Sequence, residues 1–465
     1  MNTFTSHRRA RGSPAVGQDP ARGTDTQVAG RGVPLAQSPT RQASDAAAEA
    51  LRPLVHLLLG GAPPVRFEFW DGSGLGPSDG LGTVHIASAD AIRRILWAPG
   101  ELGLARAFVA GNIEIDGDIF EVLRAMDDAA PADLRWLGLR ALPAALGAAH
   151  RLGVLGLPPP PPAEEVRPPG RRHSPARDAR AVSHHYDVGN DFYRMVLGPS
   201  MTYSCARFVE ATMSLEDAQA SKHELVCLKL GLDHRPGARL LDVGCGWGSM
   251  ALHAAQAHGA LVVGVTLSAP QVELARRRVK EAGLENQVEI RLQDYRQLGG
   301  KRFDVISSIG MFEHVGASRM AEYFKTLHGL LNVGGRLLNH AISTPDGSRI
   351  GRRSFIGRYV FPDGELLDVG EVVLAMQRAG FEVRDVESLR EHYSKTLHAW
   401  VENLQSNWDA AVAVVGAARA NTWRLYMAAS ANNFDKGDLG IHQVLGVVPD
   451  ADGHSAMPLT RTGWC

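Results

Sequence analysis

The sequence predicts an α/β protein whose main domain is a mostly parallel sheet flanked by helices, with a small α+β domain before it. Two observations carry this prediction. From about residue 182 onward, apolar runs of strand length alternate with helical patterns, which is typical of a parallel sheet covered on both faces. The first run, residues 239–243, ends in Asp-Val and is followed by Gly-Cys-Gly-Trp-Gly at 244–248. A helical pattern begins directly after this last glycine. This is the sequence of a strand, a tight glycine turn and a helix N-terminus.

The remaining elements of the main domain follow in regular order. Strands are predicted at 261–266, 288–292, 303–307 and 336–342, and helices at 249–258, 269–282 and 319–331. In such sheets ligands bind at the carboxyl ends of the strands, near the switch in strand order. The residues that directly follow the strands are therefore the first candidates for a functional site.

The chain before the main domain divides into three parts. Residues 1–45 have almost no large apolar side chains and predict a disordered tail without the apolar segment of a signal peptide. Residues 46–135 predict a small module with a strand at 65–70 and helices at 89–96 and 101–109. Residues 136–181 predict a helix and a proline-rich linker. Their apolar stretch is interrupted by Pro143, His150 and Arg151, so a packed helix is favoured over one that touches a bilayer surface.

Composition limits the class of protein. The chain has 465 residues, of which 45% are hydrophobic and 21% charged, as in globular proteins with a large core. The formal net charge of −1 argues against nucleic acid as a partner. No apolar run is long enough to span a membrane. The cysteines stand far apart without the Cys/His spacing of a zinc motif, so no metal and a reducing cytoplasm are expected.

The glycine turn predicts the kind of ligand. Glycines at alternate positions let the backbone approach a ligand closely, because a β-carbon there would collide with it. The turn lacks the Lys-Ser/Thr of a phosphate loop and the third-glycine spacing of a dinucleotide site. It therefore favours S-adenosylmethionine (SAM) over ATP or NAD, bound by Asp242, Gly244, Gly246 and Gly248.

Polar residues after the next two strands are further candidates for the SAM site. Thr266 and Leu267 end the second strand, where an acid often binds ribose; here the Thr266 hydroxyl and the Gln271 amide could serve, although capping by Ser268 explains this pattern nearly as well. Asp294 follows the third strand, next to Tyr295. It fits an acceptor for the adenine amino group and fits an ordinary loop acid equally well.

Two more segments carry polar groups toward the same edge. Glu313 and His314 follow the fourth strand and fit general-base chemistry, with a surface pair as the alternative. The segment 182–207 precedes the first strand, and its density of polar and aromatic residues predicts a lid over the cofactor. Cys205, at the end of this segment, is on its own merits a buried packing residue.

Several motifs in one order closely resemble the cyclopropane-fatty-acyl-phospholipid synthases and the related mycolic acid methyltransferases. They are His-Tyr-Asp-Val-Gly-Asn-Asp-Phe-Tyr at 185–193, Met-Thr-Tyr-Ser-Cys at 201–205, the glycine turn at 242–248, and the segments 264–268, 313–316, 355–362 and 392–400. The small module, with Gly-Leu-Ala-Arg at 103–106, resembles the one that precedes the catalytic domain in the phospholipid-acting branch. The resemblance implies a Rossmann-like SAM-dependent methyltransferase domain over residues 182–465, with Tyr186, Tyr203 and Ser204 at the cofactor.

The resemblance also implies an activity. Family members add a SAM carbon to the double bond of an unsaturated acyl chain of a membrane phospholipid and form a cyclopropane ring. A bicarbonate ion serves as the base, and the matching groups here are Cys205, Glu313, His340 and Tyr393, with the Ile342 backbone. A neighbouring branch forms a methylene-branched chain that a partner reductase then reduces, and the sequence does not decide between the two products.

The chemistry agrees with these residue types. The sulfonium methyl of SAM is a strong electrophile, so the enzyme needs no nucleophile; it must align the alkene, exclude water, stabilise a carbocation and remove a proton. Tyr186, Phe312 and Tyr359 could stabilise positive charge, with core packing as the alternative.

Rival functions are a non-catalytic lipid-binding protein and a small-molecule methyltransferase. The first would be favoured by a broken glycine turn or a missing Glu313, and the second is disfavoured by the additional module. We expect a cytoplasmic protein, peripheral at the inner membrane surface, whose partner is phospholipid. The oligomeric state, a homodimer included, and the role of residues 454–465 stay open.

Overall fold

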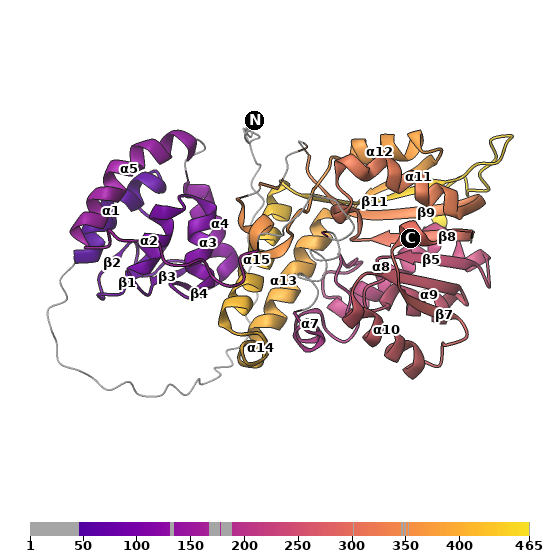
Figure 1. The fold of residues 1–465 in the computed structure, drawn as a ribbon, viewed down its shortest axis with the longest axis horizontal. Helices are drawn as coiled ribbons and strands as arrows, with labels where there is room; N and C mark the ends of the chain where they lie inside the picture. The colour runs from indigo at the N-terminus through magenta and orange to yellow at the C-terminus, as the bar shows by residue number, and fades with distance from the viewer. Residues whose placement is uncertain are drawn as a thin grey trace, which may run out of the picture.

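The computed structural model describes residues 46–130, 134–166, 177, 188–300, 302–345, 347, 350–351 and 353–464. The predicted tail, Tyr186 and much of the predicted linker lie outside these residues. In Figure 1 the N-terminal module lies at one end of the molecule and the C-terminal domain at the other, with long helices between them.

The C-terminal domain is built on a seven-stranded sheet with the order β10-β11-β9-β8-β5-β6-β7. Its strands are β5 (Arg239–Val243), β6 (Leu261–Thr266), β7 (Val288–Leu292), β8 (Phe303–Ile309), β9 (Leu331–Ser343), β10 (Glu382–Ser388) and β11 (Gly440–Val447). Strands β5 to β9 pair in parallel, and β11 pairs antiparallel with both β9 and β10. From β5 the chain proceeds to β6 and β7 on one side and later to β8 and β9 on the other, so the switch in strand order lies beside β5. The predicted Rossmann-like fold is confirmed.

The predicted strands and helices of this domain form, most with shifts of one or two residues at their ends; β9 begins at Leu331, five residues before the predicted start of that strand. Strand β8 continues past the predicted end at residue 307, because two serines that resemble a loop have buried partners. Ser307 donates to Asp242 at 2.7 Å, and the Ser308 hydroxyl lies 2.6 Å from that of Tyr323. The predicted helices are α9 (Ser249–His258), α10 (Ala269–Glu281) and α11 (Met320–Leu330).

Other helices of the domain were not specified by the sequence patterns. They are α7 (Asn190–Leu197), α8 (Leu215–Leu230), α12 (Val369–Arg378), α13 (Arg390–Ser406), α14 (Trp408–Val415) and α15 (Ala417–Lys436). Helix α8 has clear end signals: the Ser214 hydroxyl accepts from the Asp217 N–H, and Gly231 closes the helix with φ of 76°. Its apolar periodicity is weak because polar side chains, Gln219 and Lys222 among them, are buried along with the apolar ones.

The N-terminal module contains a four-stranded sheet with the order β2-β1-β3-β4. Its elements are α1 (Ala46–Leu58), β1 (Arg66–Phe69), β2 (Gly74–Leu75), β3 (Gly82–Ile86), α2 (Asp90–Trp97), α3 (Glu101–Val109), β4 (Ile113–Gly117), α4 (Ile119–Ala129) and α5 (Leu134–Arg151). Helix α5, which the sequence analysis grouped with the linker, packs against α1, and Arg151 donates to the Ala50 carbonyl at 3.0 Å.

The module packs on α13 and α15 of the C-terminal domain. Phe120 of α4 stacks on His398 of α13, with ring centroids 3.7 Å apart, and Asn432 of α15 donates to the Phe120 carbonyl at 3.0 Å. Glu101 of α3 accepts the Phe355 N–H at 2.9 Å. Buried apolar residues run without interruption from the module into α13 and α15, so the two parts share one core.

Candidate functional site

A pocket lies at the carboxyl ends of β5, β6, β7 and β8, where the fold predicts a ligand. We call it the cofactor pocket. The sequence-predicted residues that line it are Tyr203, Ser204, Asp242, Gly244, Gly246, Thr266, Leu267, Gln271, Asp294 and Tyr295. Gly248 is not among the lining residues, and Tyr186 lies outside the described residues.

The glycines of the turn have different roles. Gly246 has φ of 54°, and a β-carbon added there would meet no atom within 4 Å, so this backbone faces open space. Gly248 has φ of 83°, and its β-carbon would lie 3.3 Å from that of Ala275 on α10. Gly246 thus leaves room for a ligand. Gly248 instead lets α9 begin close against α10, a packing role that its place in the motif did not indicate.

Asp242 lies at the end of β5 and is buried. One carboxylate oxygen accepts from Ser307, and the other has no hydrogen-bond partner among the residues that the structure describes. Desolvation raises the pKa of Asp242 to about 6, and the Ser307 hydrogen bond and nearby Lys222 oppose this rise. A buried carboxylate oxygen without a partner fits a ligand that brings a donor, such as a hydroxyl or an ammonium group.

Lys222 is a pocket residue that sequence reasoning missed. It lies on α8, is fully buried, and donates to the Ser204 hydroxyl at 2.8 Å. Desolvation lowers its pKa to about 7, while nearby Cys205 and Asp242 oppose this change. A search of strand ends cannot find it, because it enters the pocket from a helix that precedes the first strand.

The predicted polar residues after β6 and β7 lie at the pocket and also bond to one another. Thr266 donates to the Gln271 side chain at 2.7 Å, and Ser268 caps α10 by accepting the Gln271 N–H at 3.4 Å. Capping and pocket lining therefore coexist here. Asp294 accepts from the guanidinium of Arg296 at 2.5–3.0 Å, so a contact with a ligand would have to share this carboxylate.

Glu313 is buried, in contrast to the surface pair considered as an alternative. Strand β8 ends at Ile309, which lies opposite His340 of β9. Farther along β9, the Ile342 N–H that faces the β8 side therefore has no partner in β8. Glu313 accepts this N–H at 2.8 Å. Its other oxygen has no hydrogen-bond partner within the described part of the chain, and desolvation raises the pKa of Glu313 to about 7. Its neighbour in the sequence, His314, instead lines the cofactor pocket.

His340 lies two residues before Ile342 on β9 and is also buried. The Gln443 amide nitrogen of β11 lies 3.2 Å from its Nδ1. With this nitrogen as the donor, Nδ1 accepts and the imidazole proton is on Nε2. Nε2 has no partner among the described residues. Burial holds the pKa of His340 well below its usual range, so the ring is neutral and can donate one hydrogen bond.

Cys205 and Tyr393 meet at one backbone group. The Leu389 carbonyl, just before α13, accepts the Tyr393 N–H at 3.1 Å and lies 3.6 Å from the Cys205 sulfur. Both residues are buried. Desolvation raises the pKa of the Cys205 thiol far above neutrality, so the sulfur keeps its proton. It can donate a hydrogen bond but is no nucleophile.

An aromatic cluster lies where Tyr203 meets α13 and α15. The Tyr203 ring lies 5.2 Å from that of Trp400 and 5.7 Å from that of Trp423, and its hydroxyl is 3.3 Å from that of Tyr426. Desolvation raises the pKa of Tyr426 to about 12; the Tyr203 hydrogen bond opposes this rise and the Glu313 carboxylate adds to it.

These aromatics differ from those named in the sequence analysis. Phe312 packs with Tyr323 and Phe324 in the core, Tyr359 packs with Phe355, and Tyr186 lies outside the described residues. The α15 residues Trp423 and Tyr426 come from a helix far along the chain, and no motif indicated them.

Comparison with known proteins adds to this geometry. Residues 173–444 match the family model of mycolic acid cyclopropane synthetase. A probable fatty acid methyltransferase of Mycobacterium tuberculosis is 42% identical over 418 residues, which cover 87% of this chain and 95% of the relative. A probable fatty acid methyltransferase of Pseudomonas putida is 42% identical over 406 residues, with 86% and 95% covered. A crystal structure of a mycolic acid cyclopropane synthase complexed with SAH and CTAB superposes with a TM-score of 0.55 at 34% identity, covering 58% of this chain and 98% of that one.

Proposed function

This chain belongs to the mycolic acid cyclopropane synthetase family of SAM-dependent methyltransferases, and on that premise we propose which reaction it performs. It adds a carbon from SAM to the double bond of an unsaturated acyl chain in a membrane phospholipid and forms a cyclopropane ring. The observation that carries this proposal is the presence, beside the cofactor pocket, of a buried carboxylate, Glu313, one oxygen of which has no hydrogen-bond partner among the described residues.

The residues of the cofactor pocket fit SAM. The open space over Gly246 admits the nucleoside, the free oxygen of Asp242 fits a donor group of the ligand, and Thr266 with Gln271 offers uncharged partners for hydroxyl groups. When bound, SAM supplies the electrophilic methyl carbon. Burial of the surrounding side chains excludes water from that carbon, which protects a cationic intermediate from capture. The faces of Tyr203, Trp400 and Trp423 can stabilise its charge.

The residues beyond the aromatic cluster fit a small bound anion. Glu313 and His340 each present a buried polar atom without a partner among the described residues. Cys205 and Tyr393 are also buried, and the Cys205 thiol, whose sulfur lies 3.2 Å from the Ala206 carbonyl, can donate to the anion by turning away from that carbonyl. Bicarbonate fits this set, and when bound it supplies the acceptor for the proton that the acyl chain loses. The role of Glu313 is to orient this acceptor while it holds the Ile342 N–H. His340, neutral with its proton on Nε2, donates to it.

The second candidate product is a methylene-branched acyl chain, a precursor that a reductase partner would convert to a methyl branch. The relatives are named fatty acid methyltransferases, and this name specifies neither product, so both are candidates. The choice depends on which carbon loses the proton, and hence on how the acyl chain lies against Glu313.

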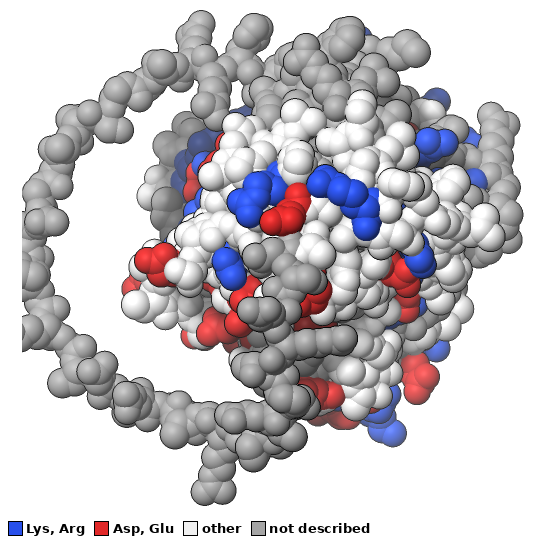
Figure 2. Space-filling model, turned by 90° about the vertical axis from the view of Figure 1, so that its left-hand side faces the viewer, with Lys and Arg blue, Asp and Glu red and all other residues white. Residues whose placement is uncertain are grey.

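We also infer that the N-terminal module carries the enzyme to the phospholipid surface. Figure 2 shows the end of the molecule that the module forms: uncharged residues cover most of its described surface, with acidic and basic groups scattered among them.

Three large apolar residues are exposed on the module: Leu157 to 87%, Trp97 to 58% and Leu155 to 54%. The Trp97 indole donates to the Gly156 carbonyl, between the two leucines. Arg93 donates to the neighbouring Val154 carbonyl. Exposed Trp and Leu beside Arg are typical of shallow insertion into a lipid interface. In the described part of the chain no helix has the length and hydropathy of a membrane span.

One experiment tests both the reaction and its product. The full chain is expressed in a bacterial host that lacks cyclopropane and methyl-branched lipids, and the phospholipid acyl chains are analysed by mass spectrometry. A product that is one CH₂ heavier and has lost its double bond supports the ring. A heavier product that keeps its double bond supports the methylene branch, and unchanged chains contradict the proposed function.

Docking is tested on phospholipid vesicles. Replacement of both Leu155 and Leu157 by Asp should lower co-sedimentation with the vesicles and leave SAM affinity unchanged. The matched control is Leu374→Asp, an exposed leucine on α12 of the other domain, 44% accessible. Equal loss of co-sedimentation in the control would contradict the assignment of this surface.

A further inference from the structure

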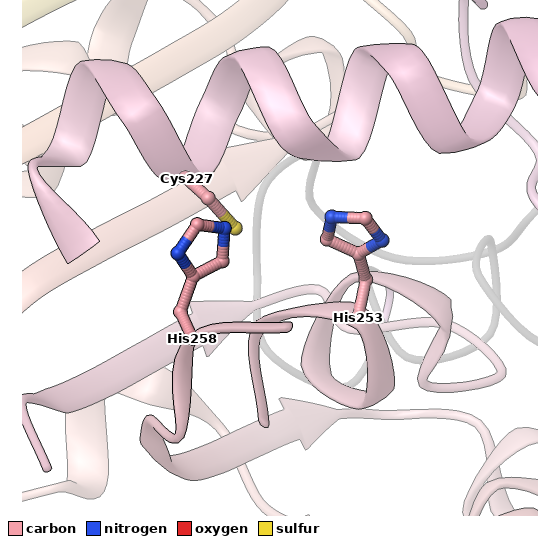
Figure 3. Close-up of side chains that lie close together, drawn as sticks. All are labelled: Cys227, His253 and His258. Atoms are coloured by element: carbon pink, nitrogen blue, oxygen red, sulfur yellow. The ribbon is translucent and has the colours of Figure 1, made fainter. Parts of the chain in front are cut away.

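A cluster of metal-ligand side chains lies outside the cofactor pocket and the base site. Cys227 of α8 and His253 and His258 of α9 offer ligand atoms that all lie within 4.8 Å of one another. Figure 3 shows the two imidazoles rising from α9 and its C-terminal end toward Cys227 on the helix above them. The sequence spacing did not indicate this cluster, because its members come from two helices separated by strand β5.

The local structure explains how these residues meet. Helices α8 and α9 pack against each other. His258 is the last residue of α9, directly before Gly259 with φ of 66°, so its ring is held at the helix end. Glu224 lies three residues before Cys227, on the same face of α8. Its carboxylate oxygen Oε2 is 2.9 Å from His253 Nε2 and 3.0 Å from His258 Nε2.

The composition of the cluster fits a transition metal. One thiol, two imidazoles and a carboxylate are the ligand types of tetrahedral zinc sites, with bonds of about 2.0–2.3 Å. The two imidazoles already point at one point in space, which the Glu224 oxygen occupies. That side chain is 41% exposed and can move outward, while Cys227 is buried and the side chain of His258 is only 9% exposed. A metal ion placed there would have two ordered ligands, one buried thiol and one movable carboxylate.

We propose that Cys227, His253 and His258 bind one Zn²⁺ ion, with Glu224 as the fourth ligand. Binding releases the Cys227 proton to solvent, and the two imidazoles bind through neutral nitrogens. The ion joins the C-terminal end of α9 to α8. Since α9 directly follows the glycine turn and α8 carries Lys222 into the cofactor pocket, the ion stabilises the frame of that pocket without touching the ligand.

Cobalt provides the direct test, because a thiolate bound to Co²⁺ gives a charge-transfer absorption band and a tetrahedral site gives intense ligand-field bands. The full-length protein is treated with a chelator, dialysed and titrated with Co²⁺. We expect both sets of bands to saturate at one equivalent, and one equivalent of Zn²⁺ to remove them. Zn²⁺ should also raise the melting temperature by roughly 3 °C at a hundredfold excess over its Kd.

Variants assign the ligands. Cys227→Ala should remove the charge-transfer band, weaken Zn²⁺ binding by at least about a hundredfold and abolish the thermal shift. His253→Gln provides the same test at a more accessible position, should the cysteine variant fold poorly. Glu224→Gln should weaken binding less, because an amide or water can complete the coordination. The matched control is His454→Ala, in an exposed cluster with Asp450 and Asp452 that has no thiol.

The outcomes are distinct. Bands that disappear in Cys227→Ala and persist in His454→Ala support the site. Absence of a charge-transfer band in the parent protein, or its persistence in Cys227→Ala, overturns it. Metal binding that is lost only in His454→Ala would assign the metal to the exposed cluster and also overturn the proposal.

Discussion

The two halves of the site are assembled in different ways. In the cofactor half, most of the lining residues lie at the ends of β5, β6, β7 and β8 or follow them, so short stretches of sequence place them. The residues proposed for the base half, Cys205, Glu313, His340 and Tyr393, come from four separate segments. Cys205 and Tyr393 both contact the Leu389 carbonyl, and Glu313 binds the Ile342 N–H on β9, the strand that carries His340. The conformation of the backbone at the strand ends therefore positions the residues of the cofactor half, and the burial of distant segments against one another positions those of the base half.

The two halves also differ in electrostatics. The cofactor half contains Asp242 and Lys222, each of which moderates the pKa shift that burial imposes on the other. In the base half, His340 is neutral and Cys205 is protonated, so the charge there is that of Glu313. Substitutions in the cofactor half should therefore alter SAM affinity, and substitutions in the base half should alter turnover.

The largest expected effect is on turnover in the base half. Glu313→Gln keeps the shape and the acceptor for the Ile342 N–H but removes the charge. Turnover should fall by about 100- to 10,000-fold, the range for loss of acid–base function, with SAM affinity near that of the parent. The measurements are product formation and calorimetric SAM titration. Equal turnover of the two forms would show that the charge of Glu313 has no part in the reaction.

The next effect is on SAM affinity in the cofactor half. Gly246→Val places a branched side chain in the open space over the turn, and the Kd for SAM should rise roughly 30-fold, as for a steric conflict of about 2 kcal/mol. Valine is also strained at φ of 54°. The control is Gly259→Val, because Gly259 has φ of 66°, is equally open and lies outside the cofactor pocket. A similar rise in Kd for both variants would attribute the effect to strain in the fold.

The sequence predicted the fold and the cofactor half because both depend on local patterns. The strands at 239–243, 261–266 and 288–292 have the predicted bounds, since buried parallel strands are short apolar runs with clear turn signals. The glycines at alternate positions identify the turn from the sequence, and all three have φ above zero in the structure. Gly248 shows the limit of this argument, because a β-carbon there would crowd Ala275 of α10 and the residue does not line the pocket, so its contact with a ligand stays a prediction.

The rest could not be predicted, because it depends on which distant segments pack together. Lys222 belongs to a helix whose periodicity is weak, and Tyr426 to one nearly two hundred residues after the glycine turn. The residues of the base half were named through the family resemblance, and composition alone would have left Cys205 a packing residue. The Cys227, His253 and His258 cluster is of the same kind: no spacing rule connects residues that meet only where α8 packs on α9.

A smaller effect on turnover is expected for Cys205. If its thiol donates to a bound bicarbonate, Cys205→Ser alters one hydrogen bond, and turnover should fall roughly tenfold with little change in melting temperature. Turnover of the parent should also fall in carbonate-depleted buffer. The control is Cys227→Ser in the presence of a chelator, also a buried thiol, for which only a stability change is expected. A methyl or acyl adduct on Cys205 in the intact mass would contradict a thiol that stays protonated.

The last expected effect concerns stability and not turnover or affinity: a pH dependence of the free energy of unfolding that belongs to the base half. Burial raises the pKa of Glu313 from its ordinary value of 4.5 to about 7, so the folded protein holds this proton more tightly than the unfolded chain. Below pH 4.5 both states are protonated and Glu313 contributes no pH dependence. Between pH 4.5 and about 7 the unfolded chain releases the proton first, so stability falls as pH rises and the loss is complete above pH 7.

The variant Glu313→Gln lacks this titration. Its free energy of unfolding should exceed that of the parent by roughly 3 kcal/mol at pH 8, and the difference should vanish near pH 4.5. Because Asp242, whose pKa is also raised, is present in both proteins, its contribution cancels in the difference. Urea unfolding of both proteins across this range measures it, and a constant difference would mean that folding leaves the pKa of Glu313 unchanged.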